Sequence, residues 1–366
     1  MNTDEKYRQV FSSMEHLVQL RREEGLLAAL GYTSNLDLLC LFSIDKLNHM
    51  IGEYLPGADL ASLECPGMIH TMEDLVSVIA YYCIHGIGGE CDIADMSLAT
   101  DHMEFTYGMG GTAVQAAMAL SEVDCPALVH LTDDSPEVCS QLDKQTIYTV
   151  SPEGELIHTG DKEQTQEQEI HFIIQFRKGD QIQSGNTIYE IPVSNRLILT
   201  NITVNEYVPF SKPYFQWIED YSDRVTSNVL SSFNCIFSEE ILKQRLKDVC
   251  RHVATYHKNN PKGIVFYEDA HYHDSLVKRL VVETLYPICD IISMNEDELS
   301  NTVAEVFRTK INTQDIFSVL KMVSRLKEYF GIRKGVVIHT KDYSMYFGDE
   351  ADADIEEGLM LGNLLA

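Results

Sequence analysis

The second half of the chain alternates short apolar runs with longer amphipathic runs, and this alternation limits the possible folds more than any other feature. The apolar runs are "RLILTNI", "GIVFYED", "CDIISMNEDEL" and "KGVVIHT", and helical patterns separate them. Strands that alternate with helices form parallel sheets, because each helix returns the chain to the same end of the sheet. Residues 196–366 therefore predict a parallel sheet with crossover helices.

The first half contains two other patterns. The stretch "EGLLAALGYTSNLDLLCLFS" has the composition of buried strand, and Thr71 and Asp74 form a capping-box pattern at the start of a helix. The stretch "CPALVHLTDDSPEV" predicts a strand followed by a helix. After it, "TIYTVSPEGELIHT", "EIHFIIQF" and "NTIYEIPV" are short strands rich in β-branched and aromatic residues. We expect these three to form a small antiparallel element of a second domain.

The overall charge and the cysteines indicate where the protein works. Lys and Arg number 28 against 56 Asp and Glu, and the net charge of -28 would repel nucleic acids and anionic lipids. The nine cysteines include no C-x-x-C pair, which favours a reducing compartment. No apolar run approaches the roughly 20 residues that span a bilayer. We expect a cytoplasmic protein that binds neither nucleic acid nor membrane, and its oligomeric state stays open.

Polar side chains follow four of the predicted strands. In open α/β sheets, ligands bind beyond the carboxyl ends of the strands. The candidates at those positions are Asn201, Glu268, Asp269, Asn295, Glu298, His339 and Thr340. Carboxylates from neighbouring strands suit Mg²⁺, often through water, because this ion keeps several of its waters. The alternative for Asn295 and Glu298 is that they only cap a helix.

Three further features are candidates for ligand binding. The stretch "YGMGGTAVQAAMALSEV" places glycines before a helix, an arrangement that often binds phosphate. Arg196 stands at a predicted domain junction, where its planar guanidinium could reach a phosphate, although a surface ion pair explains it equally well. His171 lies in the middle of a strand, where a lone histidine is more often structural than ligand-binding.

Five stretches, taken in order, resemble one known family. They are "GYTSNLDLL", "GMGGTAVQAAMAL", "IHFIIQF", "NRLIL" and "SMNEDEL". They are similar to the ADP-dependent glucokinase and phosphofructokinase family, a branch of the ribokinase-like kinases, from about Gly31 to the final residue. The resemblance implies an α/β fold: a ribokinase-like three-layer sandwich with a mostly parallel central sheet, plus a smaller α/β lid domain. We expect residues 1–37, 108–145 and 197–366 to form the large domain, and residues 38–107 and 146–196 to form the lid.

The resemblance also implies an activity. Members of this family transfer the β-phosphoryl group of ADP, with Mg²⁺, to a sugar, and they produce AMP and a sugar phosphate in glycolysis. The acceptor here would be glucose or fructose 6-phosphate, so the expected partners are small molecules. Two alternatives remain: a non-catalytic remnant that binds sugar or nucleotide, and a ribokinase-type kinase that uses ATP on another small molecule.

Residue roles follow from the same resemblance and from the strand ends. The expected sugar-binding residues are Asp37, Glu90, Gly110, Gly111 and His171. The expected nucleotide-binding residues are Arg196, Asn201, His339 and Thr340. The expected metal-binding residues are Glu268, in the family's H-x-E motif, and Glu298, in its N-x-x-E motif. The paired glycines would let the backbone approach the sugar, and Glu90 would favour a neutral sugar over a sugar phosphate.

The chain departs from the family pattern at three places. Phe266 stands where the H-x-E motif has its histidine, which puts support of Glu268 in doubt. Thr112 stands where a glutamine often follows the glycine pair. The sequence contains no G-x-G-D motif, which in the family supplies an anion hole and the aspartate that takes the proton of the attacking hydroxyl. We therefore expect a truncated kinase without its catalytic base and with very low activity.

Overall fold

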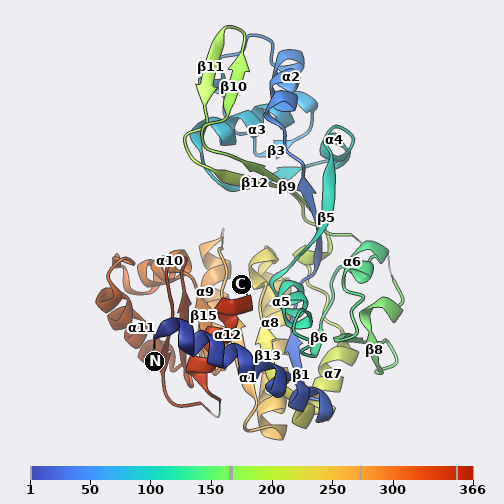
Figure 1. The fold of residues 1–366 in the computed structure, drawn as a ribbon, viewed down its shortest axis with the longest axis vertical. Coiled ribbons are helices and arrows are strands. Elements are labelled where there is room, and N and C mark those ends of the chain that lie inside the picture. The colour runs from blue at the N-terminus through green and yellow to red at the C-terminus, as the bar shows by residue number, and fades with distance from the viewer. Residues whose placement is uncertain (1, 165–167, 273, 352, 366) are drawn as a thin grey trace. The chain divides into compact units, whose positions relative to one another are not determined.

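The computed structural model describes residues 2–164, 168–272, 274–351 and 353–365. Contacts divide the chain into two compact units (Figure 1), here called the large unit and the small unit. The large unit comprises Met1–Ser34, Gly111–Gln166 and Asn205–Ala366, and the small unit comprises Asn35–Gly110 and Glu167–Val204.

The large unit is built on a mostly parallel sheet. Over the described residues this sheet has nine strands in the order β17-β16-β15-β14-β13-β1-β6-β7-β8. Its strands are β1 (Leu27–Leu30), β6 (Ala127–Val129), β7 (Ile147–Val150), β8 (Leu156–His158), β13 (Val225–Leu230), β14 (Ile264–Glu268), β15 (Ile291–Met294), β16 (Gly335–His339) and β17 (Ser344–Gly348). Only the two edge strands, β8 and β17, run antiparallel to their neighbours. The predicted parallel α/β sheet is confirmed.

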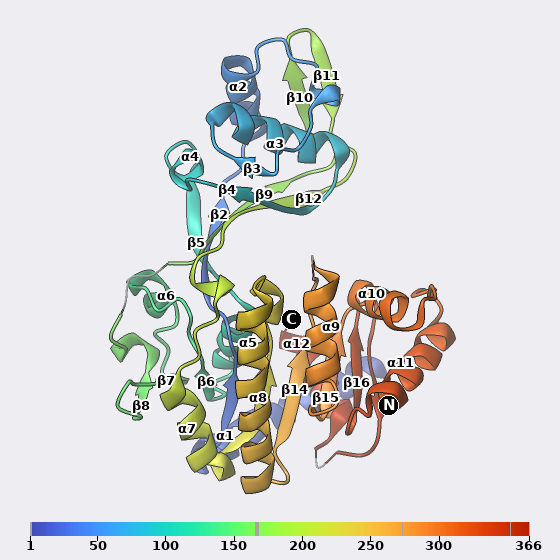
Figure 2. The same ribbon diagram turned by 180° about the vertical axis from the view of Figure 1, so that it is seen from behind.

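Helices cover both faces of this sheet. Figure 1 shows one layer in front, formed by α1 (Thr3–Glu23), α5 (Thr112–Ser121) and α12 (Ile355–Leu365), and Figure 2 shows the opposite layer, formed by α7 (Lys212–Asp220), α8 (Glu239–Asn259) and α9 (Ser275–Leu285). The remaining helices of the unit are α6 (Pro136–Gln141), α10 (Glu296–Phe307) and α11 (Ile316–Phe330). Buried side chains of both strands and helices, such as Val265, Ile292 and Leu285, form the core between the layers. The three-layer sandwich is thereby confirmed.

The small unit has its own sheet. Within the described residues, six strands follow the order β3-β4-β12-β9-β2-β5, and β10 and β11 form a separate hairpin. The elements are β2 (Asn35–Cys40), α2 (Ile44–Tyr54), β3 (Met68–Ile69), α3 (Met72–His85), β4 (Gly89–Ile93), α4 (Ser97–Thr100), β5 (Phe105–Gly110), β9 (Ile170–Phe176), β10 (Gln181–Ser184), β11 (Thr187–Glu190) and β12 (Asn195–Asn201). Helix α3 begins with the predicted capping box of Thr71 and Asp74.

The two faces of the small sheet differ in composition. Phe172, Ile174 and Phe176 of β9 are buried, and α2 and α3 lie on one face of the sheet (Figure 1). Successive side chains of a strand point to opposite faces, so His171 and Gln175 lie on the other face. This second face is called the polar face below. It also carries Asn35 and Asp37 of β2, the two polar residues in an otherwise apolar stretch.

All four predicted domain boundaries differ from those of the structure. Residues 146–166 belong to the large unit, because β7 runs parallel to β6 and β8 pairs back onto β7. Strand β12, which we expected to open the large parallel sheet, lies in the small sheet between β4 and β9. Asp37 and Gly110, placed in the large domain by sequence, also belong to the small unit. Strand composition alone does not say which neighbour a strand will find, and that pairing decided all of these cases.

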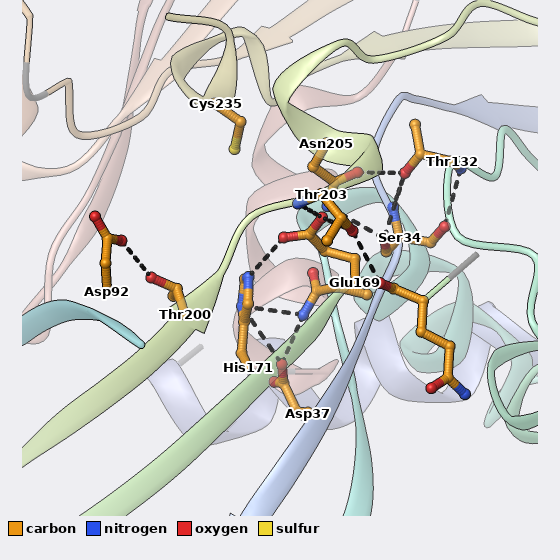
Figure 3. Close-up of polar contacts among 12 residues, drawn as sticks. Ser34, Asp37, Asp92, Thr132, Glu169, His171, Thr200, Thr203, Asn205 and Cys235 are labelled. Carbon is orange, nitrogen blue, oxygen red and sulfur yellow. Dashed lines mark hydrogen bonds and ion pairs between the residues drawn. The ribbon is translucent and has the colours of Figure 1, made fainter. Parts of the chain in front are cut away.

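A buried polar cluster lies in the large unit (Figure 3). The hydroxyl of Thr132 accepts a hydrogen bond from the backbone N–H of Ser34 at 3.0 Å and donates to Asn205. The side-chain amide of Asn205 donates in turn to the carbonyl oxygen of Ser34 at 3.3 Å. Ser34 and Asn205 are end residues of two segments of this unit, so the cluster joins those ends.

No helix in the described part of the chain is long and apolar enough to cross a membrane.

Candidate functional site

Acidic side chains gather at the carboxyl ends of β14 and β15 in the large unit. Glu268 is the last residue of β14, Asp269 follows it, and Glu298 lies in the first turn of α10, directly after β15. Strands β14 and β15 are parallel neighbours, so their carboxyl ends meet at the same edge of the sheet. The structure thus brings together the carboxylates that the sequence analysis proposed for a metal.

These carboxylates affect one another's ionisation. Burial raises the pKa of Glu298 to about 7, and the charges of Asp269 and Glu268 contribute to this increase. Burial also raises the pKa of Asp269 to about 6. A bound cation would stabilise the ionised form of these carboxylates, because its positive charge offsets their mutual repulsion. Over the described ranges, no three His, Cys, Asp or Glu side chains are placed to hold a metal ion directly, so a cation here would be held partly through water.

The alternative interpretation of the N-x-x-E motif is also realised. The side chain of Asn295 caps α10 by accepting hydrogen bonds from the backbone N–H groups of Asp297 and Glu298, each at 2.9 Å. In return, Glu298 Oε2 accepts from the backbone N–H of Asn295 at 2.8 Å. This capping box fixes the orientation of the Glu298 carboxylate. Capping and metal binding are therefore compatible, because the cap uses only one carboxylate oxygen.

Two predicted nucleotide-binding residues have local partners. His339, at the end of β16, places its Nε2 3.0 Å from Oε1 of Glu268, and this hydrogen bond raises the pKa of His339. Thr340 uses its hydroxyl within its own turn, where it accepts from the backbone N–H groups of Asp342 and Tyr343 at 3.1 and 3.0 Å. The contact of His339 supports Glu268, which Phe266 in the H-x-E position cannot do by hydrogen bonding.

Sequence reasoning missed the residues behind this cluster. Asp269 Oδ2 accepts from the hydroxyl of Tyr286 at 2.8 Å, and the hydroxyl of Tyr267 lies 3.4 Å from Oδ1. Lys278 of α9 is 4% exposed, and its charge acts on both Asp269 and Glu298. A lysine and tyrosines inside amphipathic patterns carry no signal of such a role, because the same residues occur at ordinary helix and strand positions.

The small unit holds a second candidate site on its polar face (Figure 3). Asn35 donates to Asp37 Oδ1 at 2.7 Å, and its amide nitrogen lies 3.1 Å from Nδ1 of His171. Because the amide is a donor, Nδ1 of His171 is the acceptor in this contact, and a ring proton sits on Nε2. Burial raises the pKa of Asp37, whereas His171, Asn35 and Arg196 act in the opposite direction.

Glu169 is a residue of this site that the sequence did not reveal. It is fully buried, and its Oε2 accepts from the backbone N–H of Thr203 at 2.8 Å (Figure 3). Its Oε1 lies 3.6 Å from Nε2 of His171, the nitrogen that carries the proton. His171 is thus placed between two carboxylates, Glu169 and Asp37, and this arrangement favours a fixed orientation of the ring.

The structure gives a reason for glycine at positions 110 and 111 that does not involve a ligand. A Cβ at Gly110 would lie 1.9 Å from the amide nitrogen of Asn35 and 2.3 Å from Oδ1 of Asp37. Gly111 has a φ of +95°, and a Cβ there would lie 2.5 Å from the carbonyl oxygen of Thr33. Gly110 therefore makes room for the side chains of Asn35 and Asp37, in addition to any approach of a ligand.

The other predicted binding residues also lie in the small unit. Glu90 is exposed on β4, and Asn201 is exposed at the end of β12. Arg196, near the start of β12, is exposed, and its charge lowers the pKa of Asp37. Arg196 was expected in the lid, next to the domain junction, and it lies in the small unit. Asn201 was expected on the large domain, and its location on β12 is a correction that follows from the pairing of this strand with β9.

Comparison with known proteins identifies the family. A family model described as the ADP-specific Phosphofructokinase/Glucokinase conserved region matches residues 27–366. The chain belongs to this family. The resemblance found in the five sequence stretches is thereby confirmed. The family indicates an ADP-dependent sugar kinase, with ADP as the phosphoryl donor.

Individual members of the family are distant in sequence. The ADP-specific phosphofructokinase of Pyrococcus furiosus is 22% identical, and the match covers 94% of this chain and 80% of that protein. The phosphofructokinase of Pyrococcus horikoshii OT3, solved with AMP, has a TM-score of 0.71 at 14% identity, with 90% of this chain and 77% of that chain covered. An ADP-dependent kinase solved with fructose-6-phosphate and ADPβS has a TM-score of 0.68 at 15% identity, with 93% and 72% covered. These likenesses confirm the ribokinase-like fold.

Proposed function

We propose that this chain is an ADP-dependent sugar kinase that binds glucose or fructose 6-phosphate and transfers to it the β-phosphoryl group of ADP. The observation that carries this proposal is the arrangement of Asp37, His171 and Gly110 on the polar face of the small unit. Charged acceptors of this kind bind the hydroxyl groups of a sugar strongly, because a hydrogen bond to a carboxylate is charge-assisted.

The sugar site consists of hydrogen-bond acceptors and one imidazole. Asp37 accepts from a sugar hydroxyl with the oxygen that Asn35 leaves free, and the imidazole of His171 lies beside it, with Nδ1 3.8 Å from Oδ1 of Asp37. Glu90, two strands away from β9 on β4, adds a third group for the hydroxyls.

The donor and its metal belong to the carboxyl ends of the large sheet. Glu268 and Glu298 fit Mg²⁺, because their negative charges converge while Mg²⁺ keeps part of its water shell. When bound, Mg²⁺ neutralises the charge of the ADP phosphates. We assign His339 and Thr340 to the phosphates, and His339 serves first as the partner of Glu268. The assignment of Arg196 and Asn201 to the phosphates stays a prediction from sequence.

The proposed reaction is a direct phosphoryl transfer. The oxygen of a sugar hydroxyl forms a bond to the β-phosphorus of ADP, and the bond from that phosphorus to the bridging oxygen breaks. AMP leaves with the electron pair of the broken bond. The proton of the hydroxyl is released as the new bond forms; in the family it goes to the aspartate of G-x-G-D, a motif that does not occur within residues 1–366.

The decisive experiment measures binding and turnover separately. The full chain is titrated with glucose, fructose 6-phosphate and ADP by calorimetry, and then incubated with each sugar, Mg²⁺, and ADP or ATP. We expect one of the sugars and ADP to bind, with formation of AMP and a sugar phosphate from ADP. Binding without any product would favour the non-catalytic remnant. Turnover with ATP alone would contradict the proposal.

A further inference from the structure

One row of paired residues crosses the polar face of the small sheet. Asp37 of β2 pairs with His171 of β9, His171 pairs with Thr200 of β12, and Thr200 pairs with Asp92 of β4. Directly paired residues on neighbouring strands point to the same face. The row therefore continues from the proposed sugar site, Asp37 and His171, to a threonine and a second aspartate that no sequence pattern singled out.

Thr200 and Asp92 are joined by a hydrogen bond. The hydroxyl of Thr200 donates to Oδ1 of Asp92 at 3.1 Å (Figure 3). Thr200 is 2% exposed, whereas Asp92 is exposed. The buried threonine thus fixes the direction of an exposed carboxylate, whose Oδ2 is not used in that bond. A carboxylate held in one rotamer loses less entropy when it accepts a hydroxyl than a free one does.

The spacing of the row suits a sugar that lies over His171. Neighbouring strands are about 4.8 Å apart, so Asp37 and Thr200 flank the imidazole at about that distance on either side. Asp92 stands one strand further, and its bond to Thr200 directs one of its carboxylate oxygens toward the row. A ligand with hydroxyls on both sides of its ring would meet an acceptor at each end.

We propose that Asp92 is a sugar-binding residue, that Thr200 positions it, and that together they complete the half of the site opposite Asp37. The ligand class is a polyol with hydroxyl groups on several adjacent carbons. This inference rests on the proposed function, because it assumes that Asp37 and His171 bind the sugar.

The test measures sugar affinity in the full chain by calorimetry, with glucose and fructose 6-phosphate as the two probes. The variants are Asp92→Asn, Thr200→Val and Thr200→Ser, with Asp37→Asn as the reference for the site. Glu190→Gln and Thr187→Val, both at exposed positions of β11, are matched controls. Thermal unfolding of each variant shows whether it is folded.

The expected results separate the inference from the proposed function. Asp92→Asn removes a charged acceptor and should therefore weaken binding of the sugar by about tenfold or more. Thr200→Val should weaken it by a few fold, since the carboxylate stays but is no longer held, and Thr200→Ser should restore wild-type affinity. If Asp37→Asn weakens binding while Asp92→Asn leaves it unchanged, the inference is overturned and the proposed function stands. If the wild type binds neither sugar, or Asp37→Asn has no effect, both are overturned.

Discussion

The imidazole of His339 contacts the carboxylate of Glu268 across an intervening strand. Glu268 pairs with Ser293 of β15, and Ser293 pairs with Val337 of β16, two residues before His339. Nε2 of His339 lies 3.0 Å from Oε1 of Glu268. Phe266, two residues before Glu268 on β14, cannot make such a bond, and the hydrogen bond to Glu268 comes from a strand two places away.

This contact predicts a specific effect on metal affinity. Replacement His339→Ala should weaken binding of Mn²⁺, used as a spectroscopic substitute for Mg²⁺, by about tenfold or more, because partners that orient a metal-binding carboxylate contribute this much. His339→Gln should stay close to wild type, since its amide can still donate to Glu268. Electron paramagnetic resonance of free Mn²⁺ measures the affinity.

A matched control for this prediction is His16→Ala, which removes an exposed histidine from α1 of the same unit. It should leave Mn²⁺ affinity unchanged. Equal weakening in the alanine and glutamine variants would contradict a role of the hydrogen bond. Failure of the wild type to bind Mn²⁺ would instead contradict the metal assignment of Glu268 and Glu298.

Gly110 should be intolerant of even the smallest side chain. In Gly110→Ala the new Cβ would displace Asn35 and Asp37, which it would otherwise meet at 1.9 and 2.3 Å. We expect the free energy of unfolding to fall by about 1–3 kcal/mol and sugar binding to be lost. Gly52→Ala in α2 is the control: nothing lies within 4 Å of its Cβ, so it should stabilise the protein by about 0.5–1 kcal/mol. Urea denaturation and sugar calorimetry test both variants.

The buried cluster around Thr132 should contribute to stability through its hydroxyl. Thr132→Val keeps the shape of the side chain but leaves the N–H of Ser34 and the amide oxygen of Asn205 without this partner. The expected loss is about 1–3 kcal/mol of unfolding free energy, the cost of unsatisfied buried polar groups. Thr106→Val, at an exposed position of β5, should change stability by less than about 0.5 kcal/mol. Similar values for the two variants would show that the cluster contributes little.

How far the sequence predicts this structure depends on which interactions decide each feature. Local patterns were sufficient for the alternation of β14 to β16 with helices, and for the capping motifs at Thr71 and Asn295. They missed β13 (Val225–Leu230), which lies in a stretch that the sequence analysis interpreted as helical. They were insufficient for β12 and β7, because either sheet accepts an apolar strand and only long-range pairing selects one. The same limit applies to Glu169 and Asp92, whose positions in the site follow from strand register, which a single sequence does not contain.

The buried histidine at the end of β6 predicts how stability changes with pH. Nδ1–H of His130 donates to the carbonyl oxygen of Tyr32 at 2.7 Å, and Nε2 accepts from the backbone N–H of Ser211 at 3.0 Å, so the folded state needs the neutral ring. Burial lowers the pKa of His130 from 6.5 to about 4. Between these two values the unfolded chain binds a proton that the folded chain does not.

Stability should therefore fall as the pH is lowered from 7.5 to 4.5, by about 2–3 kcal/mol from this group. In His130→Gln the other groups still titrate, so the difference between the two proteins isolates this contribution. Urea denaturation at both pH values measures it, and equal pH dependence in both would contradict the neutral buried imidazole.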